Sequence, residues 1–224
     1  MKQRVKTDVF LLISVIVVTG IFYVSPPFFS RNNLLEIILD FVGFVTILKG
    51  VSWRVMARGH KKANSHRSES LVTTGIYTIS RNPMYLGTLM IGLGFTLILW
   101  PWWAVPLFAI VFYQRFKHEM AKEENFLTQK FGVVYQNYCA QTPRLFPSFT
   151  KALSLRVRDI VNLKEAFSTK ESWGLLSWPA LAFLLACLQQ QVAMGYVDLL
   201  RMGLVLWTAV FTFVVGFILK YWFK

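Results

Sequence analysis

Six apolar stretches alternate with polar, mostly basic segments along the 224 residues of the chain. An apolar stretch of roughly 20 residues is long enough for a helix to cross the hydrocarbon core of a membrane. The pattern therefore predicts an all-α fold, a polytopic integral membrane helical bundle with about six transmembrane helices. We place these helices at about residues 9–24, 34–57, 84–99, 104–116, 173–188 and 199–217.

The third and fourth apolar stretches are joined by Trp100-Pro101-Trp102-Trp103 and are expected to form a helical hairpin. Tryptophan is enriched at the membrane–water interface, so this turn marks the far tip of the hairpin. The second stretch contains Glu36 and Asp40, which lie on one helix face. These carboxylates either face the interior of the bundle or lie near the outer interface, and the pattern leaves both alternatives open.

Three polar segments separate the apolar stretches. Residues 54–80 are polar and basic, which predicts a cytoplasmic loop. Residues 114–144 carry an apolar stripe at helical spacing that breaks at Gly132, as is typical of an amphipathic helix at a membrane surface. Residues 151–170 are also basic and amphipathic. We expect the last two segments to form interfacial helices on the cytoplasmic side.

The composition indicates a lipid environment, because only 16% of the residues are charged, against about 25% in soluble domains. The net charge is +13, yet every lysine and arginine except Arg31, Lys49 and Arg201 falls on one side of the predicted bundle. The positive-inside rule then places both termini in the cytoplasm. We therefore expect contacts with membrane lipids and no nucleic-acid partner, and the sequence identifies no protein partner. The cysteines and histidines show no metal-ligand spacing, so no metal is expected.

Polar chemistry gathers at Arg81-Asn82-Pro83, where a basic segment meets the third apolar stretch. Proline is favoured in the first turn of a helix and asparagine is a good N-cap, so a helix is expected to begin here. An arginine beside free backbone N–H groups can hold an anion. Further along the chain, Glu123 and Glu124 supply two carboxylates. On these residues alone, a solvated arginine and two surface glutamates are an alternative interpretation.

The order of several motifs resembles the isoprenylcysteine carboxyl methyltransferase family and its integral-membrane phospholipid N-methyltransferase relatives. The family pattern R-H-P-x-Y-x-G matches Arg81 to Gly87, except that Asn82 stands in the histidine position. The patterns E-E-x-x-L and F-G-x-x-Y-x-x-Y match 123–127 and 131–138. The resemblance covers about residues 70–148. It divides the chain into N-terminal helices and a loop (1–70), a cofactor-binding methyltransferase core (71–148), and an amphipathic linker with two helices (149–224).

The resemblance implies that S-adenosylmethionine binds on the cytoplasmic side while a lipophilic acceptor enters from the bilayer. It implies catalytic roles for Arg81, Glu123 and Glu124. The cofactor-binding residues that it implies are Tyr77, Asn82, Pro83, Tyr85, Gly87, Glu123 and Leu127.

The acceptor is either a carboxylate, such as a prenylcysteine-type group held by Arg81, or a phospholipid amine whose proton a glutamate accepts. Asn82 cannot titrate near neutral pH as histidine does, so any acid–base role of that position does not carry over. Two alternatives come from other classes. They are a membrane NADPH-dependent reductase resembling sterol reductases and a non-catalytic membrane protein.

Overall fold

The computed structural model describes residues 33–65, 70–147 and 163–199, together with a few positions between 17 and 20 and between 202 and 218. The elements are α2 (Asn33–Asn64), η2 (Gly75–Thr78), α3 (Pro83–Leu99), α4 (Ala104–Phe131), α5 (Val133–Gln141), α8 (Leu163–Phe167), η3 (Lys170–Trp173) and α9 (Gly174–Met194), where η marks a 3₁₀ helix. These described residues contain no β-strand, and the all-α prediction is confirmed.

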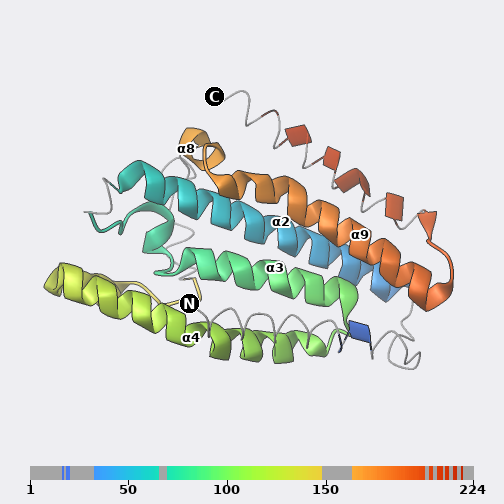
Figure 1. Cartoon of the computed structure of the whole chain (residues 1–224), viewed down its shortest axis with the longest axis horizontal. Helices are drawn as coiled ribbons and strands as arrows, with labels where there is room; N and C mark the ends of the chain where they lie inside the picture. Colours follow the sequence, from blue (N-terminus) through green and yellow to red (C-terminus); the bar gives the residue numbers. More distant parts are fainter. Residues whose placement is uncertain are drawn as a thin grey trace.

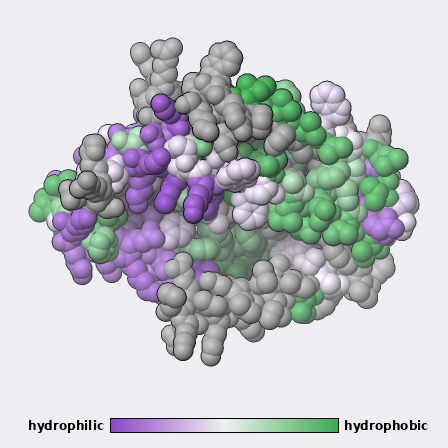
Figure 2. Space-filling view, turned by 45° about the horizontal axis from the view of Figure 1, so that its top comes forward, coloured by the Kyte–Doolittle hydropathy of each residue, from purple (hydrophilic) through white to green (hydrophobic). Residues whose placement is uncertain are grey.

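Helices α2, α3 and α9 pack against one another, and α4 lies along α3 at the edge of this group (Figure 1). The second half of α4 continues past the first residue of α3 (Figure 1). Hydrophilic residues gather toward one end of the molecule and hydrophobic residues toward the other (Figure 2). The polar end is the one at which α2 and α4 finish and α3 begins.

One described stretch, Lys170–Val192, is long and apolar enough to be a candidate membrane span, and α3 is a shorter apolar helix. The predicted helix at 9–24 and most of the one at 199–217 lie outside the described residues. The predicted number of about six spans is therefore not confirmed. The multi-pass arrangement stays a prediction.

Three predicted helix ends are wrong, because each helix continues into a segment of mixed polarity. Helix α2 extends to Asn64, whereas the polar pattern predicts a loop from residue 54. Its last turns contain Arg, Lys, Ala and Met, which are strong helix formers. Helix α4 is continuous to Phe131 and does not end at residue 116. Helix α9 runs through the glutamines at 189–191 and ends before Gly195, whose φ of 75° favours glycine.

Other local predictions are confirmed. Helix α3 has Pro83 in its first turn and ends at Leu99, close to the predicted bounds. A turn follows at residues 101–103 before α4 begins. Gly132, with φ of 55°, separates α4 from α5, as the break in the apolar stripe predicts.

Two glycine pairs bring α2 and α3 into close contact. A Cβ added to Gly94 would lie 2.4 Å from the carbonyl oxygen of Gly43, and one added to Gly50 would lie 2.7 Å from that of Gly87. Glycine at such positions lets two helix backbones approach closely. Beside these pairs lies a core of buried side chains, Phe44, Ile47, Val51, Ile91 and Ile98. The contact fixes the start of α3 against the second half of α2.

The segment from α8 to η3 docks on the second half of α2. A Cβ added to Gly59 of α2 would lie 2.4 Å from Cα of Ala166 in α8. Arg54 donates to both carboxylate oxygens of Glu171 in η3, at 2.9 to 3.0 Å. The described part of the predicted linker at 151–170 is therefore packed on α2, and its residues up to 162 lie outside the described residues. Asp40 is 3% exposed, which favours the interior-facing alternative for this carboxylate.

Candidate active site

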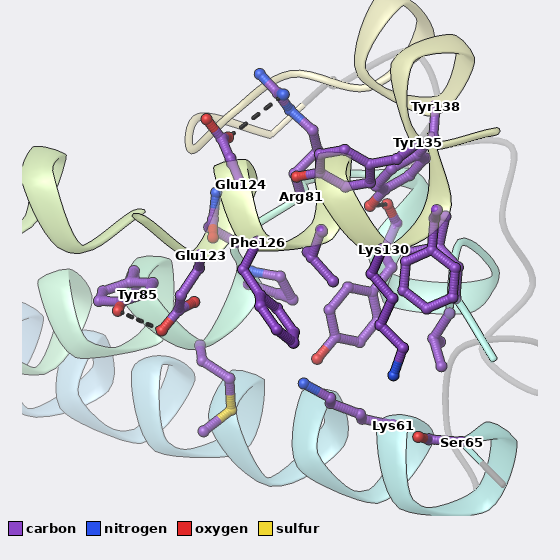
Figure 3. Close-up of a pocket in the computed structure, with 18 of the residues that line it drawn as sticks. Lys61, Ser65, Arg81, Tyr85, Glu123, Glu124, Phe126, Lys130, Tyr135 and Tyr138 are labelled. Atoms are coloured by element: carbon purple, nitrogen blue, oxygen red, sulfur yellow. Dashed lines mark hydrogen bonds and ion pairs between the residues drawn. The ribbon is translucent and has the colours of Figure 1, made fainter. Parts of the chain in front are cut away.

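A cavity of about 880 Å³ lies where the second halves of α2 and α4 meet η2, the start of α3 and α5 (Figure 3). Of the site residues predicted from the sequence, all but Gly87 line this cavity. The lining residues among them are Tyr77, Arg81, Asn82, Pro83, Tyr85, Glu123, Glu124 and Leu127. The structure thus brings the arginine motif and the two glutamates into one cavity, although α3 and much of α4 separate them in sequence.

Glu124 lies between two arginines. Its Oε1 is 3.3 Å from Nη1 of Arg81, and its Oε2 is 3.0 Å from Nη2 of Arg144. The Glu124 side chain is 18% exposed, so both pairs are partly shielded from solvent. Such pairs contribute more than exposed surface pairs, which contribute about 1 kcal/mol or less. Arg144 was not predicted as a site residue, and it contacts the second carboxylate oxygen, Oε2, while Arg81 contacts Oε1.

Glu123 has a different environment from that of Glu124. Its Oε1 accepts a hydrogen bond of 2.9 Å from the phenol of Tyr85 in the first turn of α3 (Figure 3). The Tyr85 ring packs against Phe116, with 5.4 Å between the ring centroids. Within the part of the chain that the structure describes, Glu123 forms no ion pair. Glu123 is therefore oriented by a neutral group, whereas Glu124 is held by two cations.

Asn82 ties the start of α3 to the segment that follows α5. It occupies the N-cap position, but its side chain makes no capping hydrogen bond, so the predicted capping role is wrong. Its Nδ2 instead donates to the carbonyl oxygen of Arg144 at 3.0 Å. Two further hydrogen bonds run alongside, from Ser80 Oγ to Leu145 O at 2.9 Å and from the Arg81 backbone N to Pro143 O at 2.9 Å. These contacts hold the segment that carries Arg144 beside the start of α3, where Arg144 reaches Glu124.

The Arg81 guanidinium is engaged by the protein itself. Its Nη1 lies 2.7 Å from Sγ of Cys139 in addition to its pairing with Glu124. Burial acts to lower the pKa of Arg81, but the Glu124 carboxylate and the Cys139 thiol outweigh it, and the pKa is raised. Arg81 is therefore a permanent cation that is only partly available to a ligand.

Three tyrosines line the cavity next to Arg81; Tyr135 is buried, and Tyr77 and Tyr138 are half-buried. Burial raises the pKa of Tyr77 to about 12, against the opposing effect of the nearby Arg58 guanidinium. Burial also raises the pKa of Tyr135 and Tyr138 above the ordinary value for a phenol. Tyr138 donates a hydrogen bond of 2.7 Å to the carbonyl oxygen of Tyr77. These phenols stay neutral at neutral pH and act as hydrogen-bond donors.

Several basic residues of the cavity were not predicted as site residues. Besides Arg81, the lining includes Arg54, Arg58 and Lys61 from α2 and Lys122 and Lys130 from α4. The three residues of α2 lie three or four positions apart, a spacing that puts them on one face of a helix. The sequence pattern misses these three residues of α2 because it predicts a loop from residue 54 onward. Continuing the helical pattern to residue 64 would have found them.

Gly87 does not line the cavity and lies against α2. A Cβ at this position would be 2.6 Å from Cγ of Arg54 and 2.7 Å from the carbonyl oxygen of Gly50. Its contribution is to let α3 approach α2 closely enough for Arg54 to hydrogen-bond Thr88.

The fold and cavity define a helical protein with a cavity lined by charged and polar residues at one end of an apolar bundle. Residues 41–133, which include all of α3 and α4, match the model of the phospholipid methyltransferase family. No solved structure matches the chain.

Three relatives carry the name of one enzyme. The chain is 36% identical over 77 residues to protein-S-isoprenylcysteine O-methyltransferase A of Arabidopsis thaliana, covering 34% of this chain and 39% of that protein. It is 32% identical over 82 residues to the Schizosaccharomyces pombe protein-S-isoprenylcysteine O-methyltransferase, covering 37% of this chain and 35% of that protein. It is 33% identical over 86 residues to protein-S-isoprenylcysteine O-methyltransferase B of Arabidopsis thaliana, covering 38% of this chain and 44% of that protein.

These matches confirm the predicted resemblance to isoprenylcysteine carboxyl methyltransferases and their phospholipid methyltransferase relatives. The matched segments span less than half the length of each relative. The family model and the relatives also differ in the acceptor that their names indicate, a phospholipid in one case and an isoprenylcysteine in the other.

Proposed function

We propose that this chain is an integral-membrane methyltransferase that uses S-adenosylmethionine and acts on a lipophilic or lipid-linked acceptor. The observation that carries the proposal is the convergence of the arginine motif and both glutamates on one cavity. These residues belong to the two motifs, 81–87 and 123–127, on which the resemblance to methyltransferases rests. The distribution of lysine and arginine supports a cytoplasmic position for this site and for both termini.

The size and the lining of the cavity support S-adenosylmethionine as the ligand. A volume of about 880 Å³ falls in the range of cofactor sites, roughly 300–1,000 Å³. The lining combines carboxylates, which accept hydrogen bonds, with guanidinium, ammonium and phenol groups, which donate them. A ligand with both donor and acceptor groups, such as a ribose or an amino acid moiety, matches this lining. Tyr77, Asn82, Pro83, Tyr85 and Leu127 would contribute the remaining contacts.

When bound, S-adenosylmethionine supplies an electrophilic methyl group. The residues around it contribute chiefly by holding the reacting groups in line, because positioning alone lowers the barrier of such a displacement substantially. Glu124, fixed by Arg81 and Arg144, is suited to bind and orient a hydroxyl or ammonium group. Glu123, which among the described residues hydrogen-bonds the Tyr85 phenol and forms no ion pair, is better placed to accept a proton. Arg81 acts mainly by positioning Glu124.

The acceptor is either an amine or a carboxylate, and the two make different demands on Glu123. An amine releases a proton on methylation, and the Glu123 carboxylate would accept it. A carboxylate is already ionised and needs no base. A general base typically contributes about 10²- to 10⁴-fold to the rate. Glu123→Gln is thus expected to lower kcat strongly for an amine acceptor and only weakly for a carboxylate.

The test uses the full chain in lipid nanodiscs with labelled S-adenosylmethionine. Phosphatidylethanolamine and a farnesylated cysteine are the two acceptors, and Glu119→Gln, on the same helix but outside the cavity lining, is the matched control. We expect methyl transfer to one acceptor, together with thermal stabilisation by S-adenosylhomocysteine. Stabilisation by NADPH but not by S-adenosylhomocysteine would favour the reductase alternative. No stabilisation by either cofactor and no transfer would favour a non-catalytic protein.

A further inference from the structure

The guanidinium of Arg54 is held by two other elements of the structure. Its Nε and Nη2 donate to the carboxylate of Glu171 in η3 at 2.9 to 3.0 Å, and its Nη1 donates to the hydroxyl of Thr88 in α3. The side chains of Arg54 and Glu171 are 25% and 28% exposed. Four other cations that line the cavity are exposed to solvent; they are Arg58, Lys61, Lys122 and Lys130. Arg54 therefore depends more than these on its protein partners.

Glu171 is the partner that supplies the counter-charge of Arg54. The stem of Arg54 packs against α3 at Gly87, where an added Cβ would lie 2.6 Å from Cγ of Arg54. Beyond this point Thr88 offers a neutral hydroxyl, so the negative charge comes from Glu171. Glu171 lies outside residues 41–133, the segment that matches the family model, whereas Arg54 and Thr88 lie inside it. A residue outside the matched segment thus holds a cation of the cavity.

Arg54 and Glu123 are bound to the same stretch of α3. Arg54 donates to Thr88, and Glu123 accepts from the phenol of Tyr85. These two residues of α3 are three positions apart, which puts them on one helix face with about 5–6 Å between their Cβ atoms. Arg54 and Glu123 both line the cavity, and Glu123 forms no ion pair with any residue that the structure describes. An Arg54 guanidinium released from Glu171 would therefore have a carboxylate within its surroundings.

Partial burial decides which cation would pair with Glu123. A half-buried guanidinium without a counter-charge is unfavourable, so a released Arg54 gains by reaching another carboxylate. The exposed cations of the cavity keep their water, and ion pairs between exposed groups contribute little. Of the two carboxylates in the lining, Glu124 is already paired with Arg81 and Arg144. The carboxylate left for Arg54 is that of Glu123.

We propose that Glu171 is a positioning residue of the candidate site: by holding Arg54, it prevents that guanidinium from pairing with Glu123. The proposal rests on the proposed methyltransferase function, in which Glu123 is the group placed to accept a proton. A Glu123 carboxylate paired with Arg54 would be a weaker proton acceptor, because a nearby cation favours the ionised form. Glu171 thereby keeps Glu123 free for the acceptor, although it lies outside the matched segment.

Chemical labelling of carboxylates tests this role without relying on catalysis. The full chain in lipid nanodiscs is treated with a water-soluble carbodiimide and glycine ethyl ester, and peptide mass spectrometry measures the labelling of Glu123. Glu119, on the same helix but outside the cavity lining, is the internal reference. The wild type is compared with Glu171→Gln and with the double variant Arg54→Gln/Glu171→Gln.

Glu165→Gln is the matched control for Glu171→Gln. Glu165 lies in α8, in the same segment that docks on α2, and it pairs with Lys62 of α2 at 3.0 Å. Lys62 does not line the cavity. The control therefore removes an ion pair between this segment and α2 without releasing a cation into the cavity.

We expect Glu171→Gln to lower the labelling of Glu123, relative to Glu119, about fivefold or more. The reason is that pairing with Arg54 keeps the carboxylate ionised, whereas carbodiimide reacts with the protonated form. The double variant and the control should both stay within about twofold of the wild type, since neither contains a released Arg54. If Glu171→Gln does not fold, Glu171→Asp, whose carboxylate is drawn back by one methylene, should lower the labelling by a smaller factor.

Three results would overturn the proposal. Unchanged labelling of Glu123 in Glu171→Gln would show that Arg54 does not turn to this carboxylate. A decrease that persists in the double variant would mean that Arg54 does not carry the effect. An equal decrease in Glu165→Gln would attribute it to loosening of the docked segment. Failure of the proposed function looks different, because S-adenosylhomocysteine would then not bind the wild type, whereas the labelling pattern would remain.

Discussion

The pairing of Glu124 with two arginines leads to a quantitative prediction for Glu124→Gln. The substitution keeps the shape of the side chain and removes the charge that lies 3.3 Å from Arg81 and 3.0 Å from Arg144. A hydrogen bond to a charged group contributes about 1.5–3 kcal/mol. Because Arg144 is 30% and Glu124 18% exposed, solvent screening reduces this contribution. We expect a loss of about 2 kcal/mol in the free energy of unfolding for both contacts together.

Thermal unfolding of the purified protein in detergent measures this loss. For a chain of this size, 1 kcal/mol corresponds to a shift of about 2–4 °C in Tm, so the expected decrease is about 4–8 °C. Glu119→Gln is the control. This variant removes a carboxylate on the same helix, and the partner of that carboxylate, Lys122, is 73% exposed. The free energy of unfolding should therefore decrease by about 0.5 kcal/mol or less. If both variants lose the same stability, Glu124 is not held in the way the geometry indicates.

Glu124→Gln should also weaken binding of S-adenosylhomocysteine, because the carboxylate would no longer be fixed between its two arginines. A loss of about tenfold corresponds to 1.4 kcal/mol. Unchanged affinity for this ligand, with stability reduced as predicted, would restrict Glu124 to a structural role and contradict its proposed place at the cofactor.

Three further predictions concern the surroundings of the cavity. Burial lowers the pKa of His60 below its ordinary value of 6.5. The unfolded chain therefore binds more protons than the folded one, and the stability of the fold should decrease as the pH drops below about 6.5. The decrease in Tm between pH 7.5 and 5.5 should be smaller for His60→Gln than for the wild type. Asn82→Ala removes the hydrogen bond to the carbonyl oxygen of Arg144 and should lower the free energy of unfolding by about 1–2 kcal/mol in thermal denaturation, whereas an unchanged Tm would contradict this link. Gly87→Val would push a side chain against the backbone of α2 and should lower the free energy of unfolding by about 1–3 kcal/mol. If the spacing of α2 and α3 shapes the cavity, the variant should also bind S-adenosylhomocysteine more weakly.

Local sequence patterns predicted structure well where a single residue restricts the backbone. The helix start at Pro83 and the helix break at Gly132 are both confirmed, since each residue acts on its own neighbours; Gly132 makes the break with a positive φ. Polarity was a weaker guide. The last turns of α2 are polar and were interpreted as a loop, but polar residues on one helix face look the same in sequence whether they border a cavity or open solvent.

The sequence alone determined that the chain is helical, because helical periodicity is a property of neighbouring residues. The family resemblance then indicated which two motifs belong together. Only the tertiary structure decided which partner each polar side chain takes. Arg54 pairs with Glu171, 117 positions away, and Asn82 bonds to the backbone of Arg144 instead of capping its own helix. Such pairings depend on how helices pack and chain segments close, which no local spacing encodes. The tertiary structure likewise decided the surroundings of Gly87, which matches the site motif in sequence but packs α3 against α2.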